Sequence, residues 1–342
     1  MATTLQSAAI PTSNPDLAAQ LSALLHAAAI APLDSTGWIR VTGEDRVRWL
    51  NGMVTNAIQT LAPGEGCYNL VLNAQGRIQG DLTAFPLEGS ILLETTRDQI
   101  PALLAHLDHF IIMDDVELAD ISDSRHGLLV DGPQAAKLIA AIDISSEDDL
   151  EPLELVHVTW HSASIDLIRA HSPLIPRFEV WTDAATLRTI RDQLLIAGAT
   201  AVSPEALEHL RLLEGTPRYG ADIRNTATAH DLPQETAQTR ALHFSKGCYL
   251  GQEIVERIRS RGNVHRTLSG FQLTGTLPAP GTALTAEGKP VGELTSVAAI
   301  PLPSGPVQLA LGYIRREALD RKLPLEYPGG TATPIALPFA LS

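Results

Sequence analysis

The chain has 342 residues, of which 44% are hydrophobic and 19% charged, so it can build a large core and is not a disordered segment. Its 39 acidic residues outnumber 25 basic ones, and the resulting net charge of −14 disfavours a general nucleic-acid binder. Two cysteines, Cys67 and Cys248, are too few for a disulfide framework or for housing an iron–sulfur cluster alone, and the longest near-apolar run, residues 24–33, is too short to cross a membrane.

Helices and hairpin-connected strands are predicted for the first third of the chain. Asn14 followed by Pro15 predicts the start of a helix that runs to about Ala31. Asn73 and Gly76 bracket a turn typical of a hairpin. The other predicted elements are helices over residues 44–50 and 98–110, and strands over residues 37–42, 67–72, 77–85, 90–95 and 115–119.

A similar cycle follows and then gives way to a different pattern. Strands are predicted over residues 127–130, 156–160, 165–169 and 178–182, with helices over residues 133–142, 184–197 and 204–213. Beyond about His265, short apolar strands alternate with Gly and Pro turns, which is typical of a small barrel. We expect an α+β fold with mixed or antiparallel sheets. Its domains would be a two-lobed region over residues 1–265 and a β-barrel over residues 266–342.

The segment Ser245–Glu253, SKGCYLGQE, combines a thiol with two glycines. Gly247 and Gly251 permit backbone conformations closed to other residues, or the close approach of a ligand. Such glycines next to a cysteine indicate a tightly shaped loop.

A helix is predicted directly after this loop, from Gln252, with Glu253 and Arg257 spaced to pair on its surface. Cys248 would then lie just before a helix N-terminus and two residues after Lys246. Both neighbours favour the thiolate, so Cys248 is the candidate reactive cysteine of the chain. The alternative is a small hydrophobic residue buried in a tight turn.

The region around Cys248 is locally basic. Residues 240–266 contain six basic and two acidic residues, a net charge of +4 in an acidic protein. This could be one charged helix face, or a rim that attracts a polycarboxylate ligand or an acidic partner.

The histidines do not predict a metal centre. His106 and His109 share a helix face, and His157 and His161 share a strand face. Because neither pair belongs to an H-E-x-x-H motif or has cysteine partners, we predict no metal site.

The octet KGCYLGQE, residues 246–253, resembles the signature of YgfZ-type proteins, which are folate-binding factors of iron–sulfur cluster assembly related to the T protein of the glycine cleavage system. The resemblance extends over residues 34–320 or so. Further blocks similar to this family lie at residues 43–56, 68–81, 211–222, 232–235, 291–296 and 312–315.

The resemblance implies a three-lobed cloverleaf around a central hole that accepts tetrahydrofolate. A pterin needs an acceptor carboxylate, apolar or aromatic walls, and cations for its glutamate tail. The implied catalytic residues are Cys248, Lys246 and Asp81. The implied folate-binding residues are Asp81, Tyr219, Glu214, Gly247, Tyr249, Gly251, Gln252, Glu253 and Arg257, with Arg259 or Arg261 as other candidates for the tail.

Departures from the T-protein pattern favour the cysteine-bearing branch. Where T proteins carry paired aspartates, this chain has Gly80 and Asp81. T proteins carry a carboxylate two residues after the arginine that matches Arg211. This chain has Leu213 at that position, with Glu214 beside it. T proteins also lack the cysteine of the octet.

The resemblance thus implies a cytoplasmic, tetrahydrofolate-dependent accessory protein. It would serve iron–sulfur client enzymes or assembly proteins, without nucleic acid or membrane as partners. Two alternatives stay open: a folate-dependent aminomethyl or methyl transferase, in which Asp81 acts as the acid–base group, and a binding module without catalysis.

Overall fold

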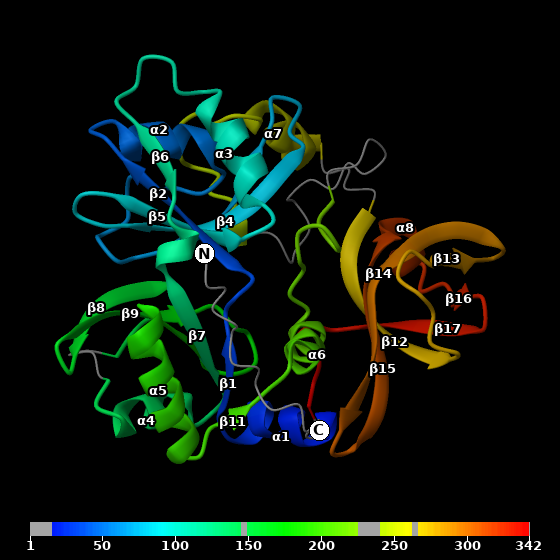
Figure 1. Ribbon diagram of the computed structural model, residues 1–342. Coiled ribbons are helices and arrows are strands. Elements are labelled where there is room, and N and C mark those ends of the chain that lie inside the picture. The colour runs from blue at the N-terminus through cyan, green and yellow to red at the C-terminus, as the bar shows by residue number, and fades with distance from the viewer. Residues whose placement is uncertain (1–15, 145–148, 225–239, 262–265, 342) are drawn as a thin grey trace, which may run out of the picture.

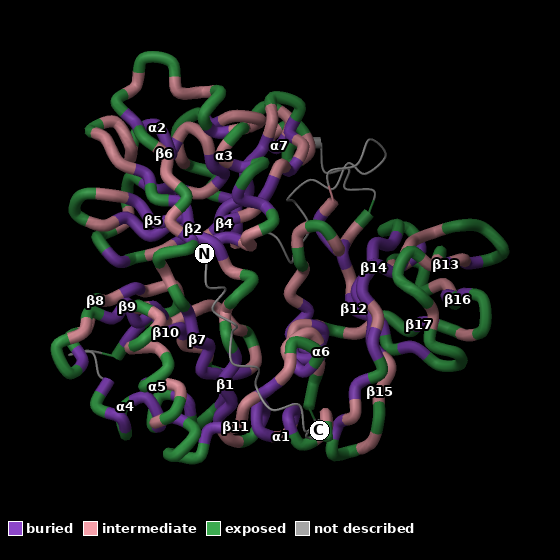
Figure 2. Tube along the Cα trace, viewed as in Figure 1, coloured by how far each residue is buried: buried purple, intermediate pink, exposed green. Residues whose placement is uncertain are grey.

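The computed structural model describes residues 16–144, 149–224, 240–261 and 266–341. Figure 1 shows three lobes: one around β2–β6, one around β7–β11, and a barrel of β12–β17. Each lobe has a buried interior and an exposed rim, as Figure 2 shows. This is the expected α+β architecture with a closed C-terminal barrel.

The first lobe is a five-stranded antiparallel sheet in the order β3-β4-β5-β2-β6. Its inner face packs against two helices through Trp49, Leu50 and Leu103. The elements are β2 (Thr36–Thr42), α2 (Arg46–Met53), β3 (Cys67–Leu72), β4 (Ile78–Pro86), β5 (Ile91–Thr96), α3 (Ile100–Asp108) and β6 (Glu117–Asp120). The predicted hairpin is confirmed, with Gly76 at a φ of +71° in the turn between β3 and β4.

The second lobe is a six-stranded sheet in the order β11-β1-β7-β10-β9-β8. Only the β1–β11 pair is parallel among these strand pairs. The elements are β1 (Ala29–Pro32), β7 (His126–Asp131), α4 (Ala135–Ala141), β8 (Glu154–Trp160), β9 (Ala163–Ala170), β10 (Arg177–Thr182), α5 (Ala184–Ile196) and β11 (Thr200–Ala201), with a 3-10 turn at Ser122–Ser124 before β7.

The two sheets pack against each other through large aromatic side chains. Trp38 of β2 and Trp181 of β10 meet edge to face, with ring centroids 5.1 Å apart. Phe85 and Ile168 belong to the same buried cluster. Aromatic pairs of this geometry stabilise an interface beyond the area that they bury, so the two lobes form one body.

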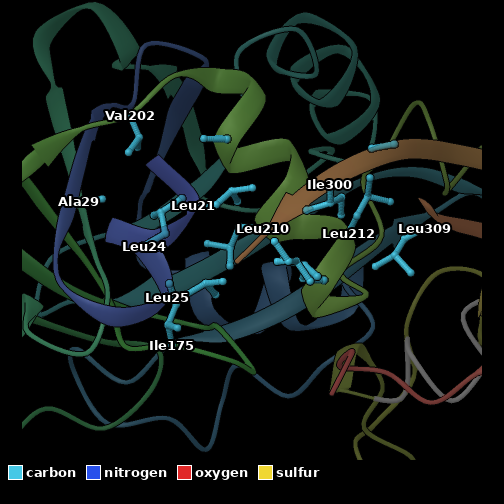
Figure 3. Packing of buried hydrophobic residues seen from close by; sticks show 14 of the residues in the cluster. Leu21, Leu24, Leu25, Ala29, Ile175, Val202, Leu210, Leu212, Ile300 and Leu309 are labelled. Atoms are coloured by element: carbon cyan, nitrogen blue, oxygen red, sulfur yellow. The ribbon is translucent and has the colours of Figure 1, made fainter. Parts of the chain in front are cut away.

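Helix α6 (Pro204–Glu214) lies between the second lobe and the barrel. Ser203 caps it by accepting a hydrogen bond from the Ala206 amide, and Pro204 occupies its first turn. Its apolar face packs on α1 (Leu17–His26) and on the barrel strands, as Figure 3 shows for Leu210, Leu24 and Ile300. Gly215 ends the helix at a φ of +70°, which leaves Glu214 at the helix terminus.

The barrel closes in the order β12-β15-β14-β13-β16-β17. Fully buried Asp222, in the segment after α6, accepts hydrogen bonds from Thr295 and Ser296 of the barrel and pairs with Arg211 at 2.7 Å. This network fixes the barrel to α6. The elements are β12 (Arg266–Gly275), β13 (Ala283–Ala286), β14 (Lys289–Leu302), β15 (Gly305–Arg315), α8 (Arg316–Asp320), β16 (Leu325–Tyr327) and β17 (Gly330–Ile335).

The prediction for the first helix is wrong at its C-terminal end. The helix stops at His26, and β1 begins at Ala29. Residues Ala29–Pro32 pair with β7 on one side, and Ala29 and Ile30 also pair with β11 on the other, so tertiary pairing overrides the helix propensity of the alanines. The predicted signals at Asn14 and Pro15 lie outside the described residues.

Two boundaries around Asp115 also differ from the prediction. Helix α2 begins at Arg46 instead of Glu44, and β6 begins at Glu117 instead of Asp115. Asp115 accepts hydrogen bonds from the amides of Glu44 and Asp45, so these residues form a tie between two loops instead of regular structure.

Candidate functional site

The loop that carries Cys248 lies on the first lobe. The His243 amide donates to the Thr55 carbonyl at 3.2 Å, and the Leu250 amide donates to the Gly52 carbonyl at 3.0 Å. Gly251 follows with a φ of +83°, and a Cβ there would lie 2.7 Å from the Asn73 carbonyl oxygen. The loop therefore turns sharply against the β3–β4 hairpin before the next helix begins.

Helix α7 (Gln252–Arg261) starts directly after this turn, as the sequence predicts. The Gln252 side chain accepts a hydrogen bond from the Tyr249 amide at 3.4 Å. The predicted stop at Gly262 lies outside the described residues. Cys248 is four positions before the first helical residue, and its thiol is free and exposed. Cys248 is therefore not a small hydrophobic residue buried in a tight turn, which was the alternative interpretation of the sequence.

Lys246 is directed into the first lobe. Its ammonium group donates to the carbonyl oxygens of Val54, at 2.7 Å, and of Asn56. It also lies 5.2 Å from the centre of the Tyr249 ring. Burial lowers the pKa of Lys246 to about 8, against the opposing effect of nearby Cys67. Within the described residues no hydrogen bond joins this ammonium to Cys248, so its visible contacts anchor the loop.

Asp81 lies on β4 with both carboxyl oxygens engaged. One oxygen accepts from the Tyr68 hydroxyl at 2.7 Å and the other from the Gln99 side-chain amide at 2.8 Å. Burial raises the pKa of Asp81, while these hydrogen bonds and nearby Arg240 act in the opposite direction. The hydrogen bonds therefore give this carboxyl group a defined orientation, and its burial raises its affinity for a proton.

Three tyrosines gather between Asp81 and the cysteine loop. Tyr68 and Tyr249 belong to one buried cluster, and Tyr219 packs against it. The Tyr219 hydroxyl donates to the Gln79 carbonyl at 2.9 Å. Burial raises the pKa of Tyr249 to about 12, so its side chain is a neutral phenol at physiological pH. The fold thus brings together Tyr219 and Tyr249, the two tyrosines named from the sequence, and adds Tyr68 to them.

A cavity of about 470 Å³ opens beside this cluster, where the second lobe meets the barrel. Glu214, at the end of α6, and His171, in the loop before β10, contribute polar groups to its wall. Its volume is within the range of small-molecule sites. The rest of the wall consists of Pro173, Gly215, Thr216, Pro217, Arg240, Thr267, Leu268, Ser269, Gly270, Leu319, Ile335, Leu337 and Pro338.

The charges around Glu214 are held by a buried network. Its carboxylate accepts a hydrogen bond from the Ser172 hydroxyl and lies 3.9 Å from Arg177, which also binds Asp131. Burial raises the pKa of Glu214, against the opposing effect of Arg177. Burial together with Arg240 and Arg177 lowers the pKa of His171 to about 4, so this imidazole is neutral at pH 7.

The residues predicted on α7 lie elsewhere. Glu253 and Arg257 form an ion pair at 2.6 Å, and their side chains are 82% and 47% exposed. Arg259 covers the ring of Phe244 at 4.1 Å. The side chain of Arg261 lies outside the described residues. The side chains of Glu253, Arg257 and Arg259 do not line the cavity, and these three charged groups face solvent instead.

Gly247 and Gly251 differ from each other. A Cβ at Gly247 would meet open space, whereas Gly251 combines a positive φ with a close carbonyl. Only Gly251 therefore needs to be glycine for the backbone, and Gly247 stays a candidate on sequence grounds.

Arg240 and Tyr68 are the residues that sequence reasoning missed. Arg240 entered only as part of a basic segment, and its position in the cavity wall depends on how three lobes meet. Tyr68 could have been found from the hairpin register, because Leu70 lies opposite Asp81 and Tyr68 is two residues away on the same face.

Metal-binding geometry is absent from the part of the chain that the structure describes, where no three His, Cys, Asp or Glu side chains converge. His106 instead contacts the Leu72 carbonyl, and His157 contacts Asp166. Among the described helices none has the length and apolar character needed to span a bilayer.

Two family models match different parts of the chain. Residues 11–237, more than half of the chain, match the GCVT N-terminal domain. The chain belongs to the GCVT family. In this GCVT-family protein, residues 266–338 also match the CAF17 C-terminal beta-barrel domain.

Relatives of this GCVT-family protein include aminomethyltransferases and an iron–sulfur cluster assembly factor. The chain is 25% identical over 337 residues to an aminomethyltransferase of Deinococcus deserti, a match that covers 96% of this chain and 90% of that protein. It is 27% identical over 296 residues to the mitochondrial iron–sulfur cluster assembly factor IBA57 homolog of Aspergillus oryzae, covering 81% of this chain and 63% of that protein.

A solved structure has the same fold. The crystal structure of glycine cleavage system aminomethyltransferase T from Bartonella henselae superposes with a TM-score of 0.82 at 22% identity, covering 95% of this chain and 89% of that one. At this identity the likeness concerns the fold, and it confirms the expected architecture of this GCVT-family protein.

Proposed function

We propose that this protein binds tetrahydrofolate and acts as an accessory factor for iron–sulfur cluster assembly or repair in client enzymes. The exposed Cys248 thiol carries the proposal, because it stands on an ordered turn within the segment that distinguishes the cysteine-bearing branch. The match to the CAF17 barrel and the similarity to the IBA57 homolog support the same branch.

The residues of the cavity fit a reduced folate. Glu214 offers a buried carboxyl group to the ring N–H groups of a pterin, and Arg240 offers a cation. The wall between them is largely apolar, with backbone from the barrel on one side. Bound there, tetrahydrofolate would supply one-carbon or reducing chemistry, and the protein would hold and shield it.

Cys248 is proposed as the group that meets the client. Its thiol is exposed, while the Lys246 ammonium and the buried Tyr249 ring fix the loop beneath it. The partners would therefore be iron–sulfur client or assembly proteins. A cytoplasmic location and a domain boundary at residues 265/266 belong to the same proposal.

Complementation tests the role of the thiol. In a bacterial strain that lacks its own protein of this branch, Cys248→Ala should lose most of the activity of an iron–sulfur client enzyme. Ser245→Ala, an exposed neighbour on the same loop, serves as the matched control and should restore activity fully. Full rescue by Cys248→Ala would exclude a chemical role for this thiol.

Titration calorimetry with tetrahydrofolate tests the ligand. We expect measurable heat and a rise in the thermal midpoint with ligand concentration, because a ligand that binds only the folded state stabilises it. Absence of both effects at high ligand concentration would favour a binding module that uses this fold without folate.

A folate-dependent aminomethyltransferase is the second candidate. The raised pKa of Asp81 favours it, since such a carboxyl group suits acid–base work. The similarity to aminomethyltransferases along nearly the whole chain also favours it. Release of methylene-tetrahydrofolate from an aminomethyl donor by the purified protein, lost in Asp81→Asn, would select this candidate over an accessory factor.

A further inference from the structure

Arg240 is fixed to the first lobe through its backbone. The Asn56 side-chain amide donates to the Arg240 carbonyl at 3.2 Å, and the Thr55 hydroxyl donates to the next carbonyl, of Ala241, at 2.7 Å. Ala241 is fully buried. The backbone of Arg240 is therefore positioned by residues 54–56, the same loop that binds the Lys246 ammonium group.

The Arg240 guanidinium lies over an aromatic ring. Its central carbon lies 4.1 Å from the centre of the Tyr68 ring. That ring is itself fixed, because its hydroxyl donates to Asp81, which Gln99 also binds. Stacking on an aromatic face orients a guanidinium while leaving its in-plane N–H groups available.

Arg240 is one of the residues that line the 470 Å³ cavity. Among the described residues no carboxylate or carbonyl is hydrogen-bonded to the Arg240 guanidinium. Arg177 shows the contrast, since Asp131 binds it through two nitrogens and Glu214 lies 3.9 Å away. Arg240 is thus an oriented cation with donors to spare at the edge of a small-molecule cavity.

We infer that Arg240 binds an acceptor oxygen, carbonyl or carboxylate, of the ligand that occupies this cavity. The inference rests on the proposed function, which supplies tetrahydrofolate as the ligand. Two of its parts carry such oxygens: the carbonyl of the pterin ring and the carboxylates of the glutamate tail. Arg240 takes the role that the sequence assigns to Arg257, whose guanidinium is paired with Glu253.

Calorimetric titration of Arg240→Gln with tetrahydrofolate tests the inference in the full-length protein. We expect the Kd to rise about tenfold or more, as for the loss of a charge-assisted hydrogen bond. Arg240→Lys keeps the charge without the planar fork and should lose part of the affinity. Arg191→Gln removes an arginine on the far helix α5 and should leave the Kd unchanged.

A second ligand, 6-methyltetrahydropterin, identifies the oxygen. It keeps the ring carbonyl and lacks the tail. If Arg240→Gln weakens both ligands equally, the contact is with the ring. If it weakens tetrahydrofolate alone, the contact is with the tail. Either result supports the inference.

Three results would overturn it. The first is a folded Arg240→Gln protein that binds both ligands within twofold of the unsubstituted protein. The second is a loss of affinity in Arg257→Gln that Arg240→Gln does not share. The third result applies if Arg240→Gln does not fold. In that case, an Arg240→Lys protein whose Kd is within twofold of that of the unsubstituted protein would overturn the inference. If the unsubstituted protein does not bind tetrahydrofolate at all, the proposed function fails first and takes the inference with it.

Discussion

The two cysteines show how one residue type acquires two roles from its surroundings. Cys67 begins β3 and is buried, with its sulfur near the Ala57 carbonyl and the Asn69 amide. Burial raises its pKa to about 11. Cys248 is exposed on a turn. Because the thiolate is the reactive form, burial makes Cys67 unreactive, whereas the exposed thiol of Cys248 is open to reagents.

Alkylation of the native protein should therefore label Cys248 alone. With iodoacetamide near pH 8, we expect one label per folded chain and two after unfolding in guanidinium chloride, counted by mass spectrometry. Cys248→Ala should take up no label while folded, and that variant is the control. A native label on Cys67 would mean that the first lobe opens readily at β3, against the packing seen around it.

Residue-level prediction succeeds where the chemistry is local. The thiol, its glycine and the following helix form one continuous segment, so Cys248 and Gly251 could be placed from the sequence. The contacts of Lys246 could not be predicted from the sequence, because its partners Val54 and Asn56 belong to a loop about two hundred residues away. Arg240 depends on the same kind of long-range contact.

At the scale of the element, the turn before α7 depends on a single backbone conformation. The φ of +83° at Gly251 brings the chain against the hairpin turn of β3 and β4, and Gly76 in that turn lies against Ile254 of α7. The two turns thus pack on each other, each through a glycine at positive φ. Side chains at either position would push α7 off the first lobe.

Gly251→Ala should destabilise the protein while Gly247→Ala should not. A left-handed conformation costs an ordinary residue about 1–2 kcal/mol, and the new Cβ would lie 2.7 Å from the Asn73 carbonyl. We expect the free energy of unfolding, from guanidinium titration, to fall by about that amount or more. At Gly247 a Cβ meets nothing within 4 Å, which makes this variant the matched control. Equal stability of the two variants would contradict the observed turn.

Elements follow from the sequence wherever one pattern dominates. Hairpin turns, alternating strands and the capped helix α6 could all be predicted, because cap and turn residues act on their immediate neighbours. The boundary between α1 and β1 could not, because alanines suit a helix and only the neighbouring strands β7 and β11 select a strand.

At the scale of the whole molecule, the interface between the first two lobes contains buried carboxyl groups. Glu94 of β5 and Glu179 of β10 are neighbours at this interface, and the Trp181 indole donates to Glu179 at 2.8 Å. Burial raises the pKa of Glu94 well above its ordinary value, and Glu179 adds to the rise; Arg125 and Arg177 act in the opposite direction. Next to Glu179, the Glu94 carboxyl group therefore keeps its proton more readily than a carboxyl group in water.

This pair should make the protein less stable as the pH rises. With its pKa raised in the folded state, Glu94 binds a proton there at pH values where the unfolded chain has lost it. The folded state then holds more protons, so the free energy of unfolding falls as the pH rises from about 4.5 through the folded pKa, by at most about 1.4 kcal/mol per pH unit for one proton. Glu94→Gln keeps a hydrogen-bonding side chain without the ionisation and should flatten this decline. Guanidinium titrations between pH 5 and 8 measure the slope, with Glu88→Gln, on the exposed turn after β4, as the control. An unchanged slope in Glu94→Gln would mean that Glu94 does not hold an extra proton in the folded state.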